Sequence, residues 1–307
     1  MIKKKQEFNK EFMKREYLLP RGRSAFFHAM QLLKLDKQNK ILIPSYIGLS
    51  QKEGSGVFDP INHLKVGYEF YKLNQDLSVN IGDFAEKIRQ KEIKAALIIH
   101  YFGFCQKGFD KIIEICKMNK KYLIEDCAHA FNSFHKNKKL GTFGDIGFYS
   151  IHKFLSTDDG GILLINNERI QIPQALRDNI SEKTLRILYK SDIGKINKKR
   201  VSNYDYLLKR IKNLKWAHAF YNKCPNGIIP INFPVIIKNK DRNYVYFKLL
   251  KRGVETVSLY HTLIPQIKKQ DYPVSYYLSR HILNLPIHED ISKHDMDIIL
   301  KELRDVL

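Results

Sequence analysis

Short strand-like segments alternate with amphipathic stretches through the first half of the chain. Segments with the length and pattern of strands lie at residues 41–44, 64–71, 95–100, 122–124 and 162–165. Between them, apolar positions recur at helical spacing in residues 26–35, 81–90 and 109–118. Strands that alternate with helices of about ten residues predict a mainly parallel sheet, covered by helices on both faces in a three-layer α/β domain.

The second half has a weaker pattern, which predicts a smaller α/β unit. Residues 169–200 are charged and are predicted to be a linker with connecting helices, followed by a helix from about Asn203 to Lys215. Further segments predict strands at residues 234–237, 254–257 and 283–285 and helices that begin at Arg242 and Ser292. We therefore predict a large domain over residues 1–190 and a small one over 191–307, with residues 1–20 as a helix or arm lying on the body.

Composition indicates a globular chain with an unusual charge. Of the 307 residues, 44% are hydrophobic and 12% aromatic, which suits an ordinary folded core. The 53 Lys and Arg against 32 Asp and Glu give a net charge of +21. The basic residues are scattered and accompany no recognisable nucleic-acid module, so we predict no nucleic-acid partner. Compositional drift and attraction of anionic substrates both remain open as explanations of the charge.

Cysteine usage and hydropathy bear on the compartment. The four cysteines show neither a CxxC pair nor zinc-ligand spacing, so we predict reduced thiols and no metal site. The N-terminal residues are charged and lack the apolar segment of a signal peptide. The apolar run near residues 95–104 is too short to span a bilayer. These features predict a cytoplasmic protein without membrane insertion.

The stretch from Ile124 to Gly161 carries the candidate chemistry. Lys153 could form a Schiff base with the aldehyde of pyridoxal phosphate, and Asp126, the second of two acids after an apolar run and at the expected carboxyl end of a buried strand, could keep the pyridine nitrogen protonated. Ser150 offers a hydroxyl to the phosphate three residues before the lysine. Taken singly, each residue also has an ordinary structural interpretation, as a surface lysine, a helix cap or a buried hydroxyl. Their order in one stretch favours the cofactor site.

This stretch resembles the core of the DegT/StrS family of pyridoxal-phosphate-dependent sugar aminotransferases. The resemblance rests on Asp126-Cys127-Ala128-His129, Gly144-Asp145, Tyr149-Ser150-Ile151-His152, Lys153 and Gly160-Gly161. Many members have two more residues between the serine and the lysine, but Lys153 keeps the usual spacing to the glycine pair. The chain is therefore identified as a short member of the family, and Lys153 as its reactive lysine.

The resemblance implies further cofactor contacts. Ser24 and Ala25 match a turn that opens a helix and binds the phosphate, and Tyr46 matches an aromatic residue that stacks on the cofactor ring. His129 is expected against the ring or its phenolic oxygen. Residues 257–261 and 283–288 resemble the family's C-terminal domain. The family's Asn-Tyr-Arg segment, which reaches the partner subunit's site, is not found in the shortened region 162–202.

The resemblance also implies an activity. It predicts the fold of the type I pyridoxal-phosphate transferases, a homodimer, and transfer of an amino group from an amino acid, expected to be L-glutamate, to a nucleotide-linked keto-sugar for surface polysaccharide or glycoconjugate biosynthesis. Lys153 would move the proton between donor and cofactor. Three alternatives stay open: a sugar dehydratase of the branch that replaces the lysine by histidine, for which His152 is adjacent; a non-catalytic relic that binds a sugar nucleotide; and nucleic-acid binding, from charge alone.

Overall fold

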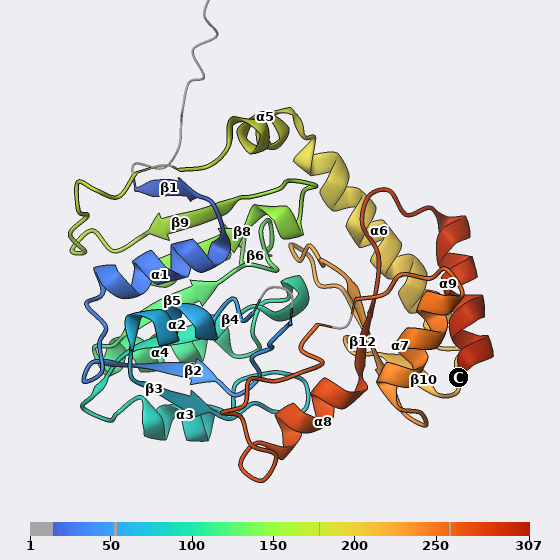
Figure 1. Cartoon of the computed structure of the whole chain (residues 1–307), viewed down its shortest axis with the longest axis horizontal. Helices are drawn as coiled ribbons and strands as arrows, with labels where there is room; N and C mark the ends of the chain where they lie inside the picture. Colours follow the sequence, from blue (N-terminus) through green and yellow to red (C-terminus); the bar gives the residue numbers. More distant parts are fainter. Residues whose placement is uncertain (1–14, 52–53, 178, 258) are drawn as a thin grey trace, which may run out of the picture.

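The computed structural model describes residues 15–51, 54–177, 179–257 and 259–307, and its centre is a seven-stranded sheet (Figure 1). Five neighbouring strands are parallel, and two more are added antiparallel at one side, β9 against β8 and then β1 against β9. In spatial order the strands are β1 (Glu16–Leu19), β9 (Gly161–Ile165), β8 (Ile146–Ser150), β5 (Tyr122–Asp126), β4 (Ile93–Ile99), β2 (Lys40–Pro44) and β3 (Tyr68–Tyr71). The prediction of a mainly parallel sheet is confirmed.

Helices cover both faces of this sheet, as their apolar positions require. Figure 1 shows α1 (Gly22–Leu32) and α2 (Phe58–Leu64) in front of the strands and α4 (Phe109–Met118) behind them. The buried side of α4 carries Phe109, Ile112, Ile115 and Cys116, which lie on one face of the helix, and it rests on β5. A shorter helix, α3 (Ile81–Lys87), packs near β3. The predicted three-layer arrangement is confirmed.

A second, antiparallel sheet organises the C-terminal part. Its strands are β10 (Ala217–Ala219), β11 (Phe233–Ile237) and β12 (Ile282–Leu285), with β11 in the middle. The helices of this part are α6 (Ile193–Ile211), α7 (Arg242–Lys251), α8 (Pro273–His281) and α9 (Lys293–Val306). Figure 1 shows them to the right of the large sheet. The boundary between residues 190 and 191 stays a prediction.

Several element boundaries differ from the sequence prediction. The helix expected from Asn203 begins ten residues earlier, at Ile193, because Asp192 caps it by accepting the N–H of Lys195. Leu64 ends α2 and does not begin a strand. Residues 254–257 form no strand beyond the isolated bridge of Val257 to Asn284. The proline-initiated helix α8 was missed altogether.

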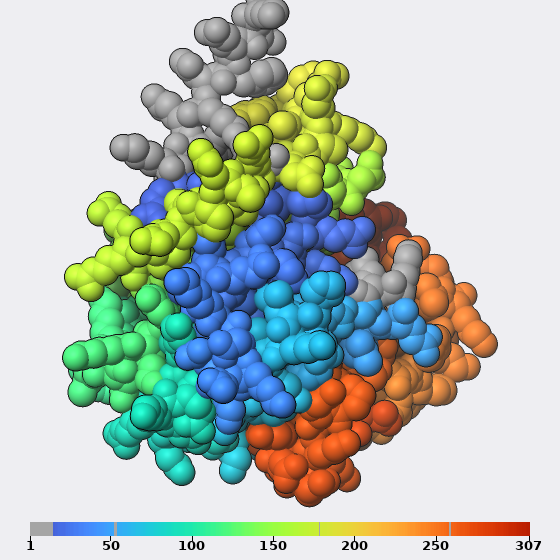
Figure 2. Space-filling view, turned by 60° about the vertical axis from the view of Figure 1, so that its left-hand side comes forward, coloured from blue at the N-terminus to red at the C-terminus, as the bar shows by residue number. Residues whose placement is uncertain are grey.

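The N-terminal prediction was partly wrong. Residues 1–14 lie outside the described residues, but Glu16–Leu19 form β1, an edge strand, where a helix or arm was expected. The chain after β9 passes over this region in Figure 2, where its yellow-green atoms lie across the blue N-terminal elements. This part of the chain includes a helix, α5 (Glu182–Lys190). Before that helix, the N–H of Asn179 donates to the carbonyl of Leu18 in β1. Contacts with a distant segment thus stabilise β1 as a strand.

Three short elements complete the large unit. A hairpin of β6 (Phe134–His135) and β7 (Lys138–Lys139) follows β5, and single 3-10 turns lie at Tyr101–Gly103 and Ile151–Lys153. The second turn directly follows β8 and carries the predicted reactive lysine.

Within the described ranges, no helix combines the length and apolarity needed to cross a bilayer.

Candidate active site

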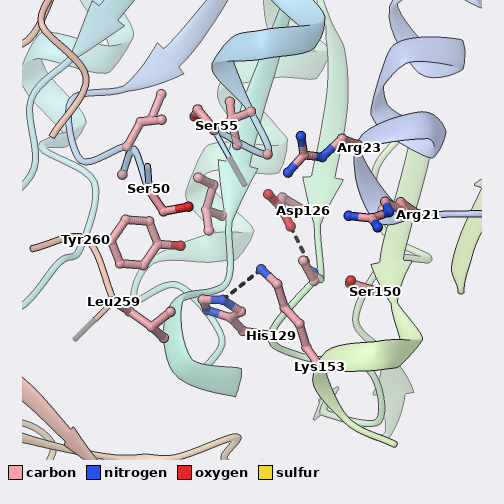
Figure 3. A pocket seen from close by; sticks show the side chains of 18 of the residues that line it. Arg21, Arg23, Ser50, Ser55, Asp126, His129, Ser150, Lys153, Leu259 and Tyr260 are labelled. Carbon is pink, nitrogen blue, oxygen red and sulfur yellow. Dashed lines mark hydrogen bonds between the residues drawn. The ribbon is translucent and has the colours of Figure 1, made fainter. Parts of the chain in front are cut away.

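A cavity of about 230 Å³ opens at the carboxyl ends of the parallel strands (Figure 3). Its walls come from the loop after β2, the end of β4, the residues after β5 and β8, the start of α1, and Leu259–His261. Carboxyl ends of neighbouring parallel strands share one edge of a sheet, which is where open α/β folds place their ligands. Asp126, His129, Ser150 and Lys153, all predicted from the sequence, line this cavity together.

Lys153 and His129 meet inside the cavity. Lys153 Nζ lies 3.3 Å from His129 Nε2, as the dashed line in Figure 3 shows. The Phe102 N–H donates to His129 Nδ1 over 3.4 Å, which places the proton of a neutral ring on Nε2. In this tautomer the Nε2–H of His129 lies on the side of the Lys153 amine. Burial, with a smaller contribution from Lys153, holds the pKa of His129 well below its ordinary value.

Asp126 is the buried acid of the cavity. It ends β5, is 6% exposed, and its Oδ1 accepts the N–H of Ala128 over 2.8 Å. Burial raises its pKa, an effect that the Ala128 N–H, Lys153 and His100 reduce. Removal of a carboxylate from water is costly unless a cation or donors compensate. Asp126 is therefore suited to a positively charged ligand group.

The neighbouring acid, Glu125, has a structural role that the sequence analysis missed. Side chains alternate along a strand, so Glu125 points away from the Asp126 side. Its carboxylate accepts the backbone N–H groups of Gly141, Phe143 and Gly144 over 2.6–2.8 Å, and its Oε2 lies 3.2 Å from His100 Nε2. These bonds attach the loop before β8 to β5. The predicted Gly144-Asp145 pair belongs to this loop, outside the cavity lining.

Within the part of the chain that the structure describes, one group of side chains has the spacing of metal ligands, and its chemistry does not suit a metal. Among the described residues, His100, Glu125 and Cys127 place a ligand atom each within 4.8 Å of one another. The Glu125 oxygens already accept three backbone N–H groups, and burial raises the pKa of the Cys127 thiol well above its ordinary value. We therefore interpret this cluster as part of the core.

The start of α1 reaches the cavity through residues other than those predicted. Arg21, Gly22 and Arg23 line it, and Gly22 packs against Ser150, where a Cβ on the glycine would lie 3.2 Å from the serine Cβ. Ser24 and Ala25 do not line it. Their N–H groups donate to the Arg21 carbonyl over 3.0 and 3.2 Å, so they are already bonded within the turn. Ser24 and Ala25 thus lie outside the cavity lining, and their contact with the phosphate stays a prediction.

Tyr46 also lies outside the cavity lining, whereas Tyr260 is part of it. Tyr46 is fully buried, and its ring centre is 4.8 Å from that of Tyr260. The Tyr260 ring lines the cavity and lies 6.0 Å from the His129 ring. Tyr260 adopts a left-handed backbone conformation with φ of 58° beside Gly48, the residue at which a Cβ would lie only 3.0 Å from its ring. Ser258, in the same motif, lies outside the described residues.

Helix α6 contacts the lysine segment from the other side. Arg200 is buried and donates to the carbonyl of Phe154, the residue after Lys153, over 3.0 Å, and to Glu289 over 2.9 Å. Asn203 donates to the carbonyls of residues 287, 288 and 291, and the Tyr204 hydroxyl to that of Tyr221. The side chains of Asn203 and Tyr204 therefore make hydrogen bonds within this chain.

Sequence comparison relates the chain to known aminotransferases. The model of the DegT/DnrJ/EryC1/StrS aminotransferase family matches residues 58–182. A GDP-perosamine synthase from Escherichia coli O157:H7 is 35% identical over 100 residues, which cover 32% of this chain and 27% of that protein. A second one, from Vibrio cholerae, is 28% identical over 172 residues, or 54% of this chain and 44% of that protein. The chain thus matches less than half the length of these relatives.

Structure comparison extends the likeness to nearly the whole chain. A putative sugar aminotransferase from Streptococcus pneumoniae, Spr1654 in its PLP form, superposes with a TM-score of 0.81. The superposition covers 95% of this chain and 87% of that one, at 14% sequence identity. The fold is therefore the one found in that aminotransferase.

Proposed function

We propose that this chain, whose residues 58–182 match the model of the DegT/DnrJ/EryC1/StrS aminotransferase family, is a pyridoxal-phosphate-dependent aminotransferase acting on a keto-sugar. The observation that carries the proposal is the placement of Lys153 and Asp126 in one cavity, with the lysine Nζ 3.3 Å from His129 Nε2. The lysine provides the amine for an aldehyde cofactor, and the buried acid provides the partner for a protonated ring nitrogen.

The residues of the cavity fit this cofactor. Asp126 has a raised pKa because it is buried, and a protonated ring nitrogen opposite it would offset the cost of its charge. Ser150 provides a hydroxyl for the phosphate, and the Tyr260 and His129 rings provide flat walls for an aromatic ring. We therefore assign the nitrogen to Asp126, the aldehyde carbon to Lys153 and one phosphate oxygen to Ser150.

Each residue then has a defined task. Bound pyridoxal phosphate supplies an electron sink, which lets the carbon beside the substrate amine lose its proton. Lys153 Nζ, as an uncharged amine, would move that proton from the donor carbon to the cofactor carbon that carried the aldehyde, and in the reaction with the keto-sugar it would carry a proton in the reverse direction, to the acceptor carbon. His129 Nε2–H orients the amine, and Asp126 holds the proton on the ring nitrogen. The apolar walls formed by Phe148 and Leu259 exclude water from the reacting atoms.

The substrates and setting belong to the proposal as well. We infer L-glutamate as the donor and a nucleotide-linked keto-sugar as the acceptor, and the GDP-perosamine synthase relatives and the +21 charge support an anionic substrate. We also infer a cytoplasmic homodimer that serves surface polysaccharide or glycoconjugate biosynthesis. A nucleic-acid partner has only the net charge in its favour.

A sugar dehydratase is the second candidate, because His152 also lines the cavity. Its Nδ1 lies 3.2 Å from Ser150 Oγ, close to the position assigned to the phosphate. Lys153 at the end of the same turn favours amino transfer, since the dehydratase branch lacks this lysine. With ¹⁵N-labelled L-glutamate and a keto-sugar nucleotide, an aminotransferase would yield a ¹⁵N-labelled sugar, and a dehydratase an unlabelled deoxygenated one.

Absorbance spectroscopy tests the cofactor step directly. Protein with added pyridoxal phosphate should show the visible band of the lysine-attached cofactor, and L-glutamate should bleach it. Lys153→Ala should abolish the band because the attachment needs the Lys153 amine. The matched control is Lys117→Ala, on the exposed side of α4, which should keep it. If the wild type shows no such band, the chain is a non-catalytic relative and the proposal is wrong.

A further inference from the structure

Two arginines project from the start of α1 into the cavity. Arg21 is the residue before the helix, with an extended backbone, and Arg23 lies in its first turn. Both line the cavity with Ser150 and Lys153. Figure 3 shows their guanidinium groups on the side where Asp126 and Ser150 lie. Formation of the helix does not require two arginines here, because other residues can occupy the N-cap and the first turn.

The charges of the cavity give these arginines a definite partner. Of the described residues that line it, Arg21, Arg23 and Lys153 are the arginines and lysines. Lys153 is assigned to the aldehyde, so its amine cannot neutralise a phosphate. A phosphate monoester carries a charge of about −1.5 to −2 at neutral pH. Arginine forks bind phosphate oxygens in pairs, and the positive end of α1 adds to their attraction.

The segment that carries these arginines makes contacts on three sides, two through its backbone and one through the Arg23 side chain. On one side Gly22 packs against Ser150. On the second, Gly161 of β9 lies so close to the Arg21–Gly22 peptide that a Cβ there would be 2.3 Å from the Arg21 carbonyl oxygen. On the third, Arg23 lies 3.5 Å from Asp59, whose Oδ2 also accepts the N–H of Ser55, on the facing wall. The guanidinium groups therefore start from fixed positions beside Ser150.

We propose that Arg21 and Arg23 form a two-arginine clamp for the cofactor phosphate, within the same subunit as Lys153. The inference rests on the proposed function and adds the residues that set cofactor affinity. Asn203 and Tyr204 are occupied inside the C-terminal part of the chain, so they do not supply this contact. The clamp places both positive charges on the chain that holds the reactive lysine.

Comparison of two aldehydes tests the clamp without relying on turnover. Apo wild-type protein and the variants Arg21→Ala, Arg23→Ala and the double variant are titrated with pyridoxal phosphate and, separately, with pyridoxal, which lacks the phosphate. Each single change should weaken pyridoxal phosphate binding by about tenfold to hundredfold, since a hydrogen bond to a charged group is lost. Binding of pyridoxal should change by less than about threefold, because that ligand makes no phosphate contact.

Matched variants separate the clamp from general effects. Arg169→Ala, at an exposed arginine after β9, should leave both affinities unchanged. Asp59→Asn keeps both arginines but removes the charge that faces Arg23, and should weaken pyridoxal phosphate less than Arg23→Ala. Thermal unfolding of each apo variant checks the fold, and the ratio of the two affinities is insensitive to a partly unfolded fraction.

The outcomes divide clearly. Selective loss of pyridoxal phosphate affinity in both single variants supports the clamp. Equal loss for both aldehydes, or no loss, overturns it while the proposed function stands, provided that wild-type binding still requires Lys153. If the wild type binds neither aldehyde through Lys153, the proposed function fails, and the clamp with it.

Discussion

At the scale of single residues, the two adjacent acids at the end of β5 have different roles, one in the fold and the other in the candidate site. Glu125 accepts three backbone N–H groups and stabilises the loop before β8. Asp126 points the other way, into the cavity, and keeps a raised pKa because it is buried. The alternation of side chains along a strand explains why neighbouring carboxylates meet such different surroundings. The sequence pointed to Asp126 because it lies at the expected carboxyl end of a buried strand, where parallel sheets present ligand-binding groups.

The stability of the apo protein should depend on pH through His129. Burial holds the folded-state pKa of His129 below 6.5, so only the unfolded state takes up the proton just below that pH. This contribution to stability is present above pH 6.5 and is lost as the pH falls. Between pH 6.5 and 5.5 the free energy of unfolding should fall, through this group, by up to about 1.4 kcal/mol per pH unit.

Urea unfolding at several pH values measures this dependence. His129→Gln keeps a polar side chain of similar size and removes the titration. The difference between wild type and variant cancels the contributions of other groups, including Asp126, whose raised pKa acts in the opposite direction at lower pH. A variant with the same pH dependence as the wild type would show that His129 is not the group responsible.

At the scale of elements, the contact between β9 and the start of α1 places the anion-binding side of the cavity. Gly161 opens β9 and pairs with Leu19 of β1, just before the Arg21–Gly22 turn that it touches. The glycine pair at residues 160 and 161 was recognised from the sequence, but its role as the support of α1 was not. That role depends on β9 lying between β1 and β8, which no local pattern encodes.

Gly161→Ala should therefore destabilise the chain and disturb the cavity. Its Cβ would lie 2.3 Å from the Arg21 carbonyl oxygen, so the turn or the strand must move. Overpacking of this kind costs about 1–3 kcal/mol, which chemical denaturation can measure. The control is Gly82→Ala in α3, where the nearest atom to the new Cβ is 3.6 Å away and alanine is the better helix former. Equal stability of both variants would contradict the contact.

At the scale of the whole molecule, Arg200 connects the C-terminal elements to the turn that carries Lys153. From α6 it donates to the carbonyls of Phe154 and Ile231 and to Glu289, which lies between β12 and α9. Its side chain is 4% exposed, whereas that of Glu289 is 28% exposed. The hydrogen bonds to Phe154 and Glu289 connect Arg200 to residues that are 46 and 89 positions away in the sequence. They place the end of the Lys153 turn against α6.

Arg200→Met should lower the free energy of unfolding substantially. Each buried carbonyl left without a donor costs about 1–3 kcal/mol, and Glu289 also loses its partner. Arg252→Met is the matched control, because its ion pair with Glu302 lies at the surface and contributes at most about 1 kcal/mol. Denaturant unfolding compares the two variants. A loss no greater for Arg200 than for Arg252 would mean that α6 does not support the lysine turn.

The sequence by itself determined the mainly parallel sheet and the core of the candidate site. Local patterns suffice there, because strand and helix periodicity, Asp126 and Lys153 all follow from residues close together in the chain. Element boundaries were less well determined: α6 begins at Ile193 because of an Asp192 cap within a polar segment that also resembled a linker.

Only the tertiary structure decided which side chains surround that core. Tyr260 faces the cavity in place of Tyr46 because a loop from the C-terminal part packs against the loop after β2. Arg21 and Arg23 face it in place of Ser24 and Ala25 because the first turn of α1 closes its own hydrogen bonds while resting on Ser150 and Gly161. Side-chain direction at such places follows from packing between distant segments, which a local pattern does not contain.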